Sequence, residues 1–416
     1  MIAAISRPML KDGPVNPAML YLGIGWLMSP QGLGYLALDP VTHASVLERI
    51  SELAVVVSLF VCGLKIQVRS SDRLWLLPLR LAFVAMAITV ALVTLAGHFL
   101  LGFPLGVALI LGAIMAPTDP VLASEVQVEN IHDRDQVRFS LTGEAGFNDG
   151  AAFPFLFLGL GVLGLHHLGP WGLSWWTVDV IWGILGGLAL GAMFGCTAGL
   201  LVRSLRTGNQ QEGVQEFLAF GLVFAAYGAA LALHTLGFLA AFAAGLALRW
   251  MEVQGHPDEG AMAHGVLGFK ERVERLLEAV MVILVGALVA TLPWDPNLFW
   301  FAPLLFLVLR PLAVSLGLLG TPLGRMRRAY LSWFGIRGIG SVYYLSYAAS
   351  HGLAAPYIQQ LAGIVYPILA VSILVHGLSV SPLMAKYSER VKEDEKGPEP
   401  SPPLEPDHRL GAAHSI

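Results

Sequence analysis

Charged residues are scarce in this sequence. Asp, Glu, Lys and Arg make up 13% of its 416 residues, whereas 56% of the residues are hydrophobic and the mean hydropathy is +0.67. Soluble domains usually carry about 25% charged residues, so this composition excludes an ordinary soluble globular protein. The net charge of -4 gives no basic surface for a nucleic-acid partner. The sequence therefore predicts a polytopic membrane protein embedded in a lipid bilayer.

Cysteine and the motifs of several enzyme classes are also rare or missing. The two cysteines, Cys62 and Cys196, both fall in apolar segments, which argues against a disulfide framework. Neither a CxxC motif nor a His-rich spacing is found, so we expect no cofactor and no resident transition metal. The absence of GxSxG and GxGD motifs argues against an intramembrane hydrolase, and we expect a protein that is not an enzyme.

Long apolar segments dominate what remains. Their length of about 20 residues suits helices that cross about 30 Å of hydrocarbon, whereas barrel strands would be shorter and alternating. We predict an all-α fold of 12 to 13 transmembrane helices. The twelve predicted spans are 16–36, 46–66, 77–101, 104–126, 137–164, 176–203, 212–233, 236–250, 270–291, 298–319, 326–350 and 357–384.

The basic residues indicate an orientation for these spans. If both termini are cytoplasmic, 22 of the 25 Lys and Arg residues fall in cytoplasmic segments, and only Arg49 falls in an outer loop. Such a bias sets topology in membrane proteins. We therefore expect a multi-pass protein of the cell membrane with both termini in the cytoplasm. Residues 1–15 would form a short cytoplasmic segment, 16–388 the transmembrane domain, and 389–416, rich in Lys, Glu, Pro and Ser, a disordered cytoplasmic tail.

Three acids stand in the apolar sequence between Ala113 and Asp149. Asp119 is flanked by Pro117 and Pro120, which an uninterrupted transmembrane helix does not accommodate. Glu144 and Asp149 follow in the next span. An ionisable residue at bilayer depth costs about 2.5 to 3.5 kcal/mol, which makes each acid a candidate functional residue. The alternatives are a capping turn around Asp119 and a cytoplasmic helix start around Glu144 and Asp149.

A second interruption is predicted near the other end of the chain. Residues Gly335 to Ser341 contain three glycines and Arg337 within an apolar span. Interrupted helices at matching places in two halves point to inverted repeats and a transport site. The repeats would cover about 16–164 and 236–384, with linking helices at about 176–233. Alternatively, Arg337 continues the cytoplasmic cluster at Arg325 to Arg328.

These motifs together resemble the monovalent cation/proton antiporters, specifically the sodium/proton exchanger branch. The resemblance rests on Thr118-Asp119-Pro120, Gly143-Glu144, Phe147-Asn148-Asp149-Gly150, Gly237 to Gly245, Arg337-Gly338 and Ser372 to Gly377. The Asn148-Asp149 pair resembles the electroneutral members, whereas an Asp-Asp pair would resemble the electrogenic ones. Many relatives have Ser after the Glu, where this chain has Ala145, which bears on the choice of ion.

The resemblance implies a homodimer in which each protomer has a dimerisation or scaffold part and a mobile core. Two discontinuous helices would cross in the core beside the ion site. Asp149 would bind the ion or proton, with Asp119, Thr118 and Asn148 around it, and Glu144 would pair with Arg337. The implied activity is exchange of Na+, or Li+, for H+ by alternating access, with a 1:1 electroneutral stoichiometry.

Residue chemistry agrees with this expectation and leaves alternatives open. A carboxylate can hold either a proton or a hard monovalent cation, and Asn148 can donate and accept hydrogen bonds without titrating. Glu278 and Arg310, in neighbouring spans, are interpreted as a second ion pair. K+/H+ exchange, electrogenic exchange and a cation channel are the alternatives.

Overall fold

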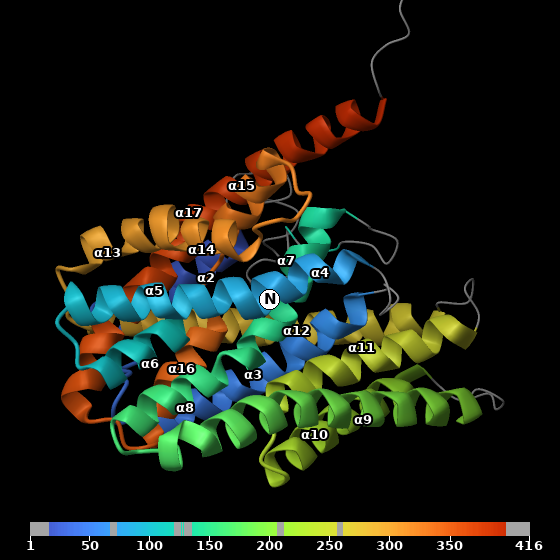
Figure 1. Cartoon of the computed structure of the whole chain (residues 1–416), viewed down its shortest axis with the longest axis horizontal. Helices are drawn as coiled ribbons and strands as arrows, with labels where there is room; N and C mark the ends of the chain where they lie inside the picture. The colour runs from blue at the N-terminus through green and yellow to red at the C-terminus, as the bar shows by residue number, and fades with distance from the viewer. Residues whose placement is uncertain are drawn as a thin grey trace, which may run out of the picture.

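The computed structural model describes residues 16–66, 73–119, 126, 128, 135–205, 212–255 and 261–396. For 202–205, 212–218, 252–255, 261–271 and 392–396 it describes the backbone alone. All regular secondary structure within these ranges is helical, and the helices lie in a roughly common direction (Figure 1). The predicted N-terminal segment 1–15 lies outside the described residues.

The helices follow the predicted spans closely. The first half contains α2 (Pro17–Met28), α3 (Ala44–Lys65), α4 (Leu76–Leu79), η2 (Arg80–Ala85), α5 (Met86–Phe99), α6 (Leu105–Met115), α7 (Gln136–Ala151) and α8 (Phe153–Val162). Then come η5 (Trp175–Trp182), α9 (Gly183–Leu205) and α10 (Glu212–Ala232). The second half contains α11 (Gly237–Gly255), α12 (Ala261–Thr291), α13 (Leu298–Leu304), η6 (Leu305–Leu309), α14 (Arg310–Gly317), α15 (Arg325–Trp333), α16 (Ile339–Ser350) and α17 (Ala355–Lys396). The short turns η1 (Arg73–Trp75) and η4 (Pro170–Gly172) complete the order.

Within the described residues, five helical stretches are long and apolar enough to cross a membrane. They are Arg73–Phe99, Gln136–Val162, Pro170–Leu201, Leu298–Gly317 and Ala355–Val391. The first predicted span, 16–36, is too long, because α2 ends at Met28, two residues before Pro30. A residue that precedes a proline is disfavoured in helical conformation, so the helix stops there.

The two predicted interruptions fall where expected. The helix α6 ends at Met115, and residues 117–119 have no regular structure; the rest of the predicted span, to 126, lies largely outside the described residues. The second interruption separates α15 from α16, with Phe334 to Gly338 between them. Each interruption places free backbone groups deep in the bundle, and those groups need partners.

The predicted disordered tail is wrong at its beginning. α17 continues past Glu389 to Lys396, so residues 389–396 are helical. This segment consists largely of Glu, Lys and Arg, which are good helix formers, and the prolines come only after it. The remainder, 397–416, lies outside the described residues.

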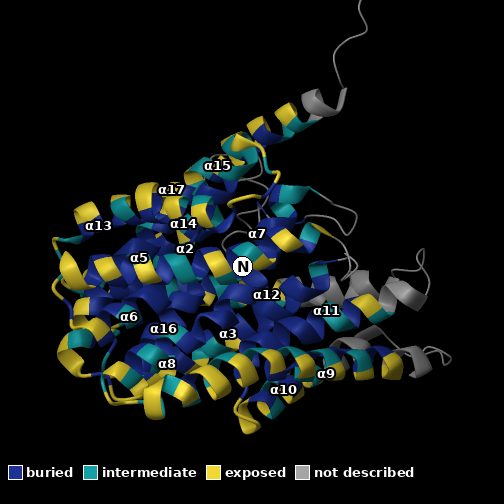
Figure 2. Cartoon of the chain, viewed as in Figure 1, coloured by how far each residue is buried: buried dark blue, intermediate teal, exposed yellow. Residues whose placement is uncertain are grey.

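The most buried helices lie in the middle of the bundle (Figure 2). α6, α7 and α16 bury most of their residues, and α3 buries every residue from Ala54 to Leu64. By contrast, α9 exposes Leu185, Met193 and Leu200, and exposed apolar faces of this kind suit contact with lipid tails. α9 and α10 lie along one side of the bundle and α13, α14 and α15 along the opposite side (Figure 1).

Two close helix crossings are related in an unexpected way. Where α2 crosses α12, a Cβ on Gly25 would overlap the carbonyl oxygen of Ile283. A Cβ on Gly286 would likewise overlap the carbonyl oxygen of Leu22. Where α3 crosses α11, a Cβ on Gly63 would overlap the carbonyl oxygen of Phe242. A Cβ on Gly245 would overlap the carbonyl oxygen of Phe60. Each glycine thus faces the residue three positions before the opposing glycine. Small residues allow such close backbone approach between membrane helices.

Candidate functional site

The two interruptions lie against each other. The backbone N–H of Asp119 donates to the carbonyl oxygen of Ile336 at 2.8 Å. Ser341, in the first turn of α16, donates its hydroxyl to the carbonyl oxygen of Ile114 in α6, also at 2.8 Å. These bonds connect segments more than 200 residues apart and satisfy backbone groups that the broken helices leave free. The sequence breaks therefore build one structural unit.

Asp119 occupies the N-terminus of α16. Its carboxylate accepts a hydrogen bond from the backbone N–H of Ile339, and its side chain is buried. A negative charge is favourable at this position because the helix dipole and the free N–H groups both attract it. Gly338 makes the approach possible, since a Cβ there would overlap the Asp119 carboxylate.

Asp149 reaches the same turn of α16 from the opposite helix, α7. Its side chain is 2% exposed, and a Cβ built on Gly340 would come within 2.6 Å of its Oδ1 atom. The Asp149 and Asp119 carboxylates are close enough for their charges to interact. Among the described residues, no hydrogen bond or ion pair engages the Asp149 carboxylate. This group is therefore the one acid of the site without a dedicated partner in the described part of the chain.

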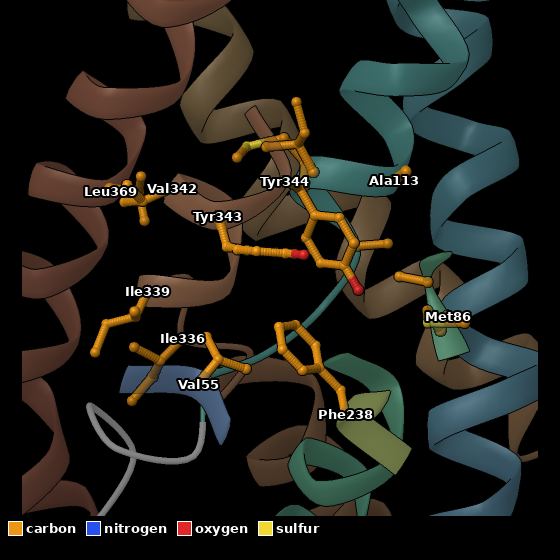
Figure 3. Close-up of a cluster of buried hydrophobic side chains, with 14 of the residues drawn as sticks. Val55, Met86, Ala113, Phe238, Ile336, Ile339, Val342, Tyr343, Tyr344 and Leu369 are labelled. Atoms are coloured by element: carbon orange, nitrogen blue, oxygen red, sulfur yellow. The ribbon is translucent and has the colours of Figure 1, made fainter. Parts of the chain in front are cut away.

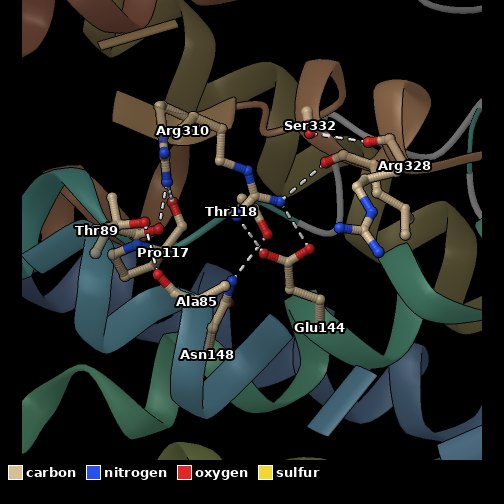
Figure 4. A network of polar contacts seen from close by, with 12 residues as sticks. Ala85, Thr89, Pro117, Thr118, Glu144, Asn148, Arg310, Arg328 and Ser332 are labelled. Atoms are coloured by element: carbon tan, nitrogen blue, oxygen red, sulfur yellow. Dashed lines mark hydrogen bonds and ion pairs between the residues drawn. The ribbon is translucent and has the colours of Figure 1, made fainter. Parts of the chain in front are cut away.

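Asn148 and Thr118 border the two carboxylates. The Asn148 side-chain amide donates to the Thr118 hydroxyl at 2.8 Å, and both residues are buried (Figure 4). The Asn148 Oδ1 atom is buried without a hydrogen-bond partner among the described residues. A buried acceptor left open is costly and is a natural ligand for a cation or a water molecule. The structure thus brings together all four predicted residues, Asp149, Asp119, Thr118 and Asn148.

The N-terminus of α7 explains why its acids are placed so deeply. Asp135 caps the helix by accepting hydrogen bonds from the N–H groups of Val137 and Arg138, each at 2.9 Å. From this cap the helix runs inward, and every residue from Phe139 to Ala151 is buried. The alternative of a cytoplasmic helix start around Glu144 and Asp149 is therefore wrong.

The predicted pairing of Glu144 with Arg337 is wrong. Glu144 instead accepts two hydrogen bonds from Arg310 of α14, at 2.6 and 2.8 Å, and both side chains are fully buried (Figure 4). The predicted Glu278–Arg310 pair is wrong for the same reason. Glu278 lies on α12, where its charge interacts with those of Glu274, Asp119, Arg275 and Lys65. The sequence shows Arg310 and Arg337 as two arginines within apolar spans, but spacing along the chain does not show which of them reaches Glu144.

Arg337 has a different role at the end of α6. Its Nη1 group donates to the carbonyl oxygens of Ala116 and Pro117. In an uninterrupted helix the residue at position 120 would donate to Ala116, but Pro120 has no N–H group. Arg337 supplies the missing donor and places a positive charge at the negative end of the α6 dipole. It is fully buried, so the alternative of a cytoplasmic Arg337 is also wrong.

Sequence reasoning missed the residues of α17 that hold the second interruption. Ser372 accepts a hydrogen bond from the backbone N–H of Arg337 at 3.0 Å. His376 lies 3.1 Å from the carbonyl oxygen of Trp333 through Nε2 and 3.2 Å from the Ser372 hydroxyl through Nδ1. Both ends of the interruption are thus fixed to α17. The only signal in the sequence is that the segment from Ser372 to Gly377 resembles a motif of the antiporter family. That resemblance does not show which residues Ser372 and His376 contact.

Aromatic side chains close one side of the site. Tyr344 of α16 donates its hydroxyl to the carbonyl oxygen of Asp149. Phe153 packs against Tyr344 and Phe238 with ring centroids 5.0 and 5.6 Å apart, and Phe238 packs against Tyr343 at 4.9 Å. Figure 3 shows Phe238 beside the two tyrosines. These rings come from α8, α11 and α16, so the closure depends on how those helices sit against one another.

The side-chain acceptor atoms that Thr118, Asp119, Asn148 and Asp149 bring together are all oxygens. The described residues contain no group of three or more His, Cys, Asp or Glu side chains arranged for a metal ion. Carboxylate, amide and hydroxyl oxygens instead suit a hard cation.

Comparison with known proteins decides the family. The family described as "Sodium/hydrogen exchanger, transmembrane" matches residues 1–386. This chain belongs to that family. As a sodium/hydrogen exchanger family member it is a multi-pass membrane transport protein, and the family is not an enzyme class.

Named relatives of this exchanger family member include bacterial antiporters. The K(+)/H(+) antiporter NhaP of Alkalimonas amylolytica is 26% identical over 392 residues, which are 93% of this chain and 65% of that protein. The Na(+)/H(+) antiporter NhaP of Pseudomonas aeruginosa is 28% identical over 307 residues, 70% of this chain and 68% of that protein. The chain thus spans about two thirds of the length of these relatives, slightly less for the first.

The fold of this family member matches a solved structure. The sodium proton antiporter MjNhaP1 from Methanocaldococcus jannaschii superposes with a TM-score of 0.72 over 92% of this chain and 95% of that one. The sequence identity is 18%, so this likeness concerns the fold. It agrees with the predicted all-helical membrane architecture.

Proposed function

We propose that this protein is a secondary active antiporter that exchanges a monovalent cation for a proton at Asp149. The observation that carries the proposal is the contrast among three buried acids. Asp119 is committed to the N-terminus of α16 and Glu144 to Arg310, whereas the Asp149 carboxylate has no partner among the described residues. A single uncommitted carboxylate, bordered by the open Asn148 Oδ1 atom, can hold one cation or one proton.

Competition for this carboxylate couples the two ions. An Asp149 that is neutralised by a proton or a cation can be buried at low cost, whereas the bare anion in a dry site is expensive. Rearrangement between the two faces of the membrane is therefore favoured only for the loaded forms. The aromatic closure by Phe153, Phe238 and Tyr344 would open and shut one access route in each cycle.

The two glycine crossings support the inverted repeat on which alternating access would depend. In an inverted repeat, α2 of the first half corresponds to α11 of the second, and α3 corresponds to α12. The α2–α12 crossing and the α11–α3 crossing are then symmetry equivalents. Both crossings have a glycine on each helix, and each glycine faces the residue three positions before the opposing glycine. Since α2, α3, α11 and α12 form these crossings, they would make the scaffold and dimerisation part, and the broken helices would belong to the mobile core. The distribution of basic residues supports placing the protein in the cell membrane with both termini in the cytoplasm.

The direct test is proton movement on addition of salt. Everted vesicles holding an acid interior should lose their pH gradient, followed with a pH-sensitive dye, when Na+ or Li+ is added. The relative from Alkalimonas amylolytica, named a K(+)/H(+) antiporter, makes K+ the second candidate. Cation currents without proton movement would identify a channel and overturn the proposal.

We expect exchange to be insensitive to membrane potential. Asn148 cannot titrate, so one cation and one proton would alternate at Asp149 and no net charge would cross. A net elementary charge would instead couple to the potential by about 2.3 kcal/mol per 100 mV. The measurement is initial exchange rate in proteoliposomes with potentials imposed by a potassium ionophore, using Na+ as the transported ion. A rate that follows the imposed potential would mean electrogenic exchange.

A methyl group at position 340 should weaken ion binding. In Gly340→Ala the new Cβ would lie within 2.6 Å of Asp149 Oδ1, so the carboxylate must shift. Overpacking of this kind costs about 1 to 3 kcal/mol, which corresponds to a rise of about fivefold to about a hundredfold in the apparent KM for the cation. Gly228→Ala on α10 is the matched control, because a Cβ there meets nothing within 4 Å. Equal KM values in both variants would show that Asp149 does not bind the ion at this turn.

A further inference from the structure

A groove on the outer surface of the bundle is not used by the transport site. It has a volume of about 380 Å³ and lies between the η6–α14 segment and α15. One wall is apolar and includes Phe306, Leu307 and Pro311, and the other wall carries Arg325 and Arg328. In Figure 1, α14 and α15 lie together on the side of the bundle away from α9 and α10. The groove therefore has one apolar wall and one basic wall.

The apolar wall continues into a surface suited to lipid. Leu307 is 60% exposed, and Leu312 and Leu316 of α14 are also exposed. These residues belong to the stretch Leu298–Gly317, which is long and apolar enough to cross a membrane. An occupant of this wall therefore comes from the hydrocarbon phase rather than from water.

The basic wall lies at an end of the bundle where positive charge gathers. Arg80 bonds the carbonyl oxygen of Leu319, and Arg327 bonds Gln136 at the start of α7, so these arginines share one end with the groove. Arg325 is exposed, and Arg328 is fixed by a bond from Nη2 to the Leu318 carbonyl oxygen at 3.2 Å. A guanidinium has five N–H donors, so both retain donors for a further acceptor.

From this arrangement we infer that the groove binds an anionic phospholipid. The two guanidinium groups take the phosphate, which they can bond in pairs, and an acyl chain follows Phe306, Leu307 and Pro311. Basic pockets between transmembrane helices on the cytoplasmic side recognise lipid headgroups in this way. The lipid would join α14, which carries Arg310, to α15, which leads into the second interruption, and would stabilise both. This inference requires a membrane protein but not the proposed exchange activity.

The test is thermal unfolding of the purified protein in a neutral detergent. Phosphatidylglycerol and phosphatidylcholine with the same acyl chains are titrated separately, and unfolding is followed by tryptophan fluorescence. We expect phosphatidylglycerol to raise the Tm of the wild type at low mole fraction and phosphatidylcholine to have no such effect. In Arg325→Gln/Arg328→Gln the half-saturating mole fraction should rise about thirtyfold, which is about 2 kcal/mol at 1.4 kcal/mol per tenfold.

Further variants separate the role of the groove from general charge and folding. Arg325→Gln alone, at an exposed position, should raise the half-saturating mole fraction of phosphatidylglycerol about fivefold, which is about 1 kcal/mol. Ser315→Trp, which fills the groove without changing charge, should abolish the response. The control Lys386→Gln/Arg390→Gln removes exposed basic side chains of α17 and should match the wild type.

Three results would overturn the inference. The first is an equal phosphatidylglycerol response in the wild type and in the Arg325 and Arg328 variants. The second is the same stabilisation by inorganic phosphate alone, which would indicate a site for a soluble anion. The third is a change of oligomeric state in the double variant with an unchanged lipid response, which would mean that a second copy of the chain covers the groove.

Discussion

Asp149→Asn is expected to abolish cation/proton exchange while leaving a folded protein. Asparagine has nearly the same shape and fits beside Gly340, but it can neither release a proton nor balance the charge of a cation. Loss of one charged ligand contact costs about 3 kcal/mol, or about a hundredfold in affinity, and the proton cycle is lost entirely. The measurement is the salt-induced loss of a pH gradient in everted vesicles, with protein abundance determined in the same membranes.

Asp179→Asn is the matched control for this variant. Asp179 is a carboxylate of η5 that pairs with His166 at 3.0 Å, outside the proposed site. It should leave exchange unchanged, which shows that the loss in Asp149→Asn is not a general effect of removing an acid. Wild-type exchange in Asp149→Asn would place the ion site elsewhere and refute the proposed coupling.

The second large effect is expected for stability. Glu144→Gln leaves the Arg310 guanidinium as an uncompensated charge at a position that is 1% exposed. Breaking a buried pair by removing one partner costs about 3 to 5 kcal/mol, which is a large share of the stability of most proteins. We expect low abundance and a clearly lower Tm in detergent. Transport by the molecules that do fold should be less affected than in Asp149→Asn.

A double variant tests whether the cost belongs to the pair. In Glu144→Leu/Arg310→Met both charges are gone and apolar groups fill the space, so much of the loss should be recovered. A double-mutant cycle measures the coupling between the two positions. Arg49→Gln breaks the exposed Arg49–Glu52 pair and should cost less than about 1 kcal/mol. If Glu144→Gln lowers the free energy of unfolding no more than Arg49→Gln does, the buried Glu144–Arg310 pair does not contribute to stability.

The sequence predicted the helices and the positions of the interruptions because both leave local signals. Apolar length, Pro117 and Pro120, and the three glycines between Gly335 and Ser341 each act through the backbone of their own segment. Thr118 and Asp119 lie in the first break itself, whereas Asn148 and Asp149 follow about 30 residues later on α7, and only the family resemblance grouped the four before the structure placed them together.

Partners across the bundle could not be predicted in the same way. Arg310 and Arg337 are both buried arginines in the second half, and nothing in their spacing shows that α14 faces Glu144 while Arg337 faces the end of α6. The roles of Ser372 and His376 depend on how α17 packs against the second interruption, which is a tertiary contact. The extension of α17 to Lys396 does not follow from the sequence, because a highly charged composition is typical both of disordered tails and of exposed helix ends.

The hydrogen bonds that tie the two broken helices together have a kinetic consequence. Asp119 with Ile336, Ser341 with Ile114, and Arg337 with Ala116 join the segments that surround Asp149. If Asp149 binds the ion as proposed, ion preference is decided within this hydrogen-bonded unit, whereas turnover depends on how easily the unit moves past α3 and α11. Under the proposed mechanism, ion selectivity and turnover rate are therefore separable. Substitutions along the surface of α3 or α11 that faces the unit should change its rate and leave its choice of ion intact.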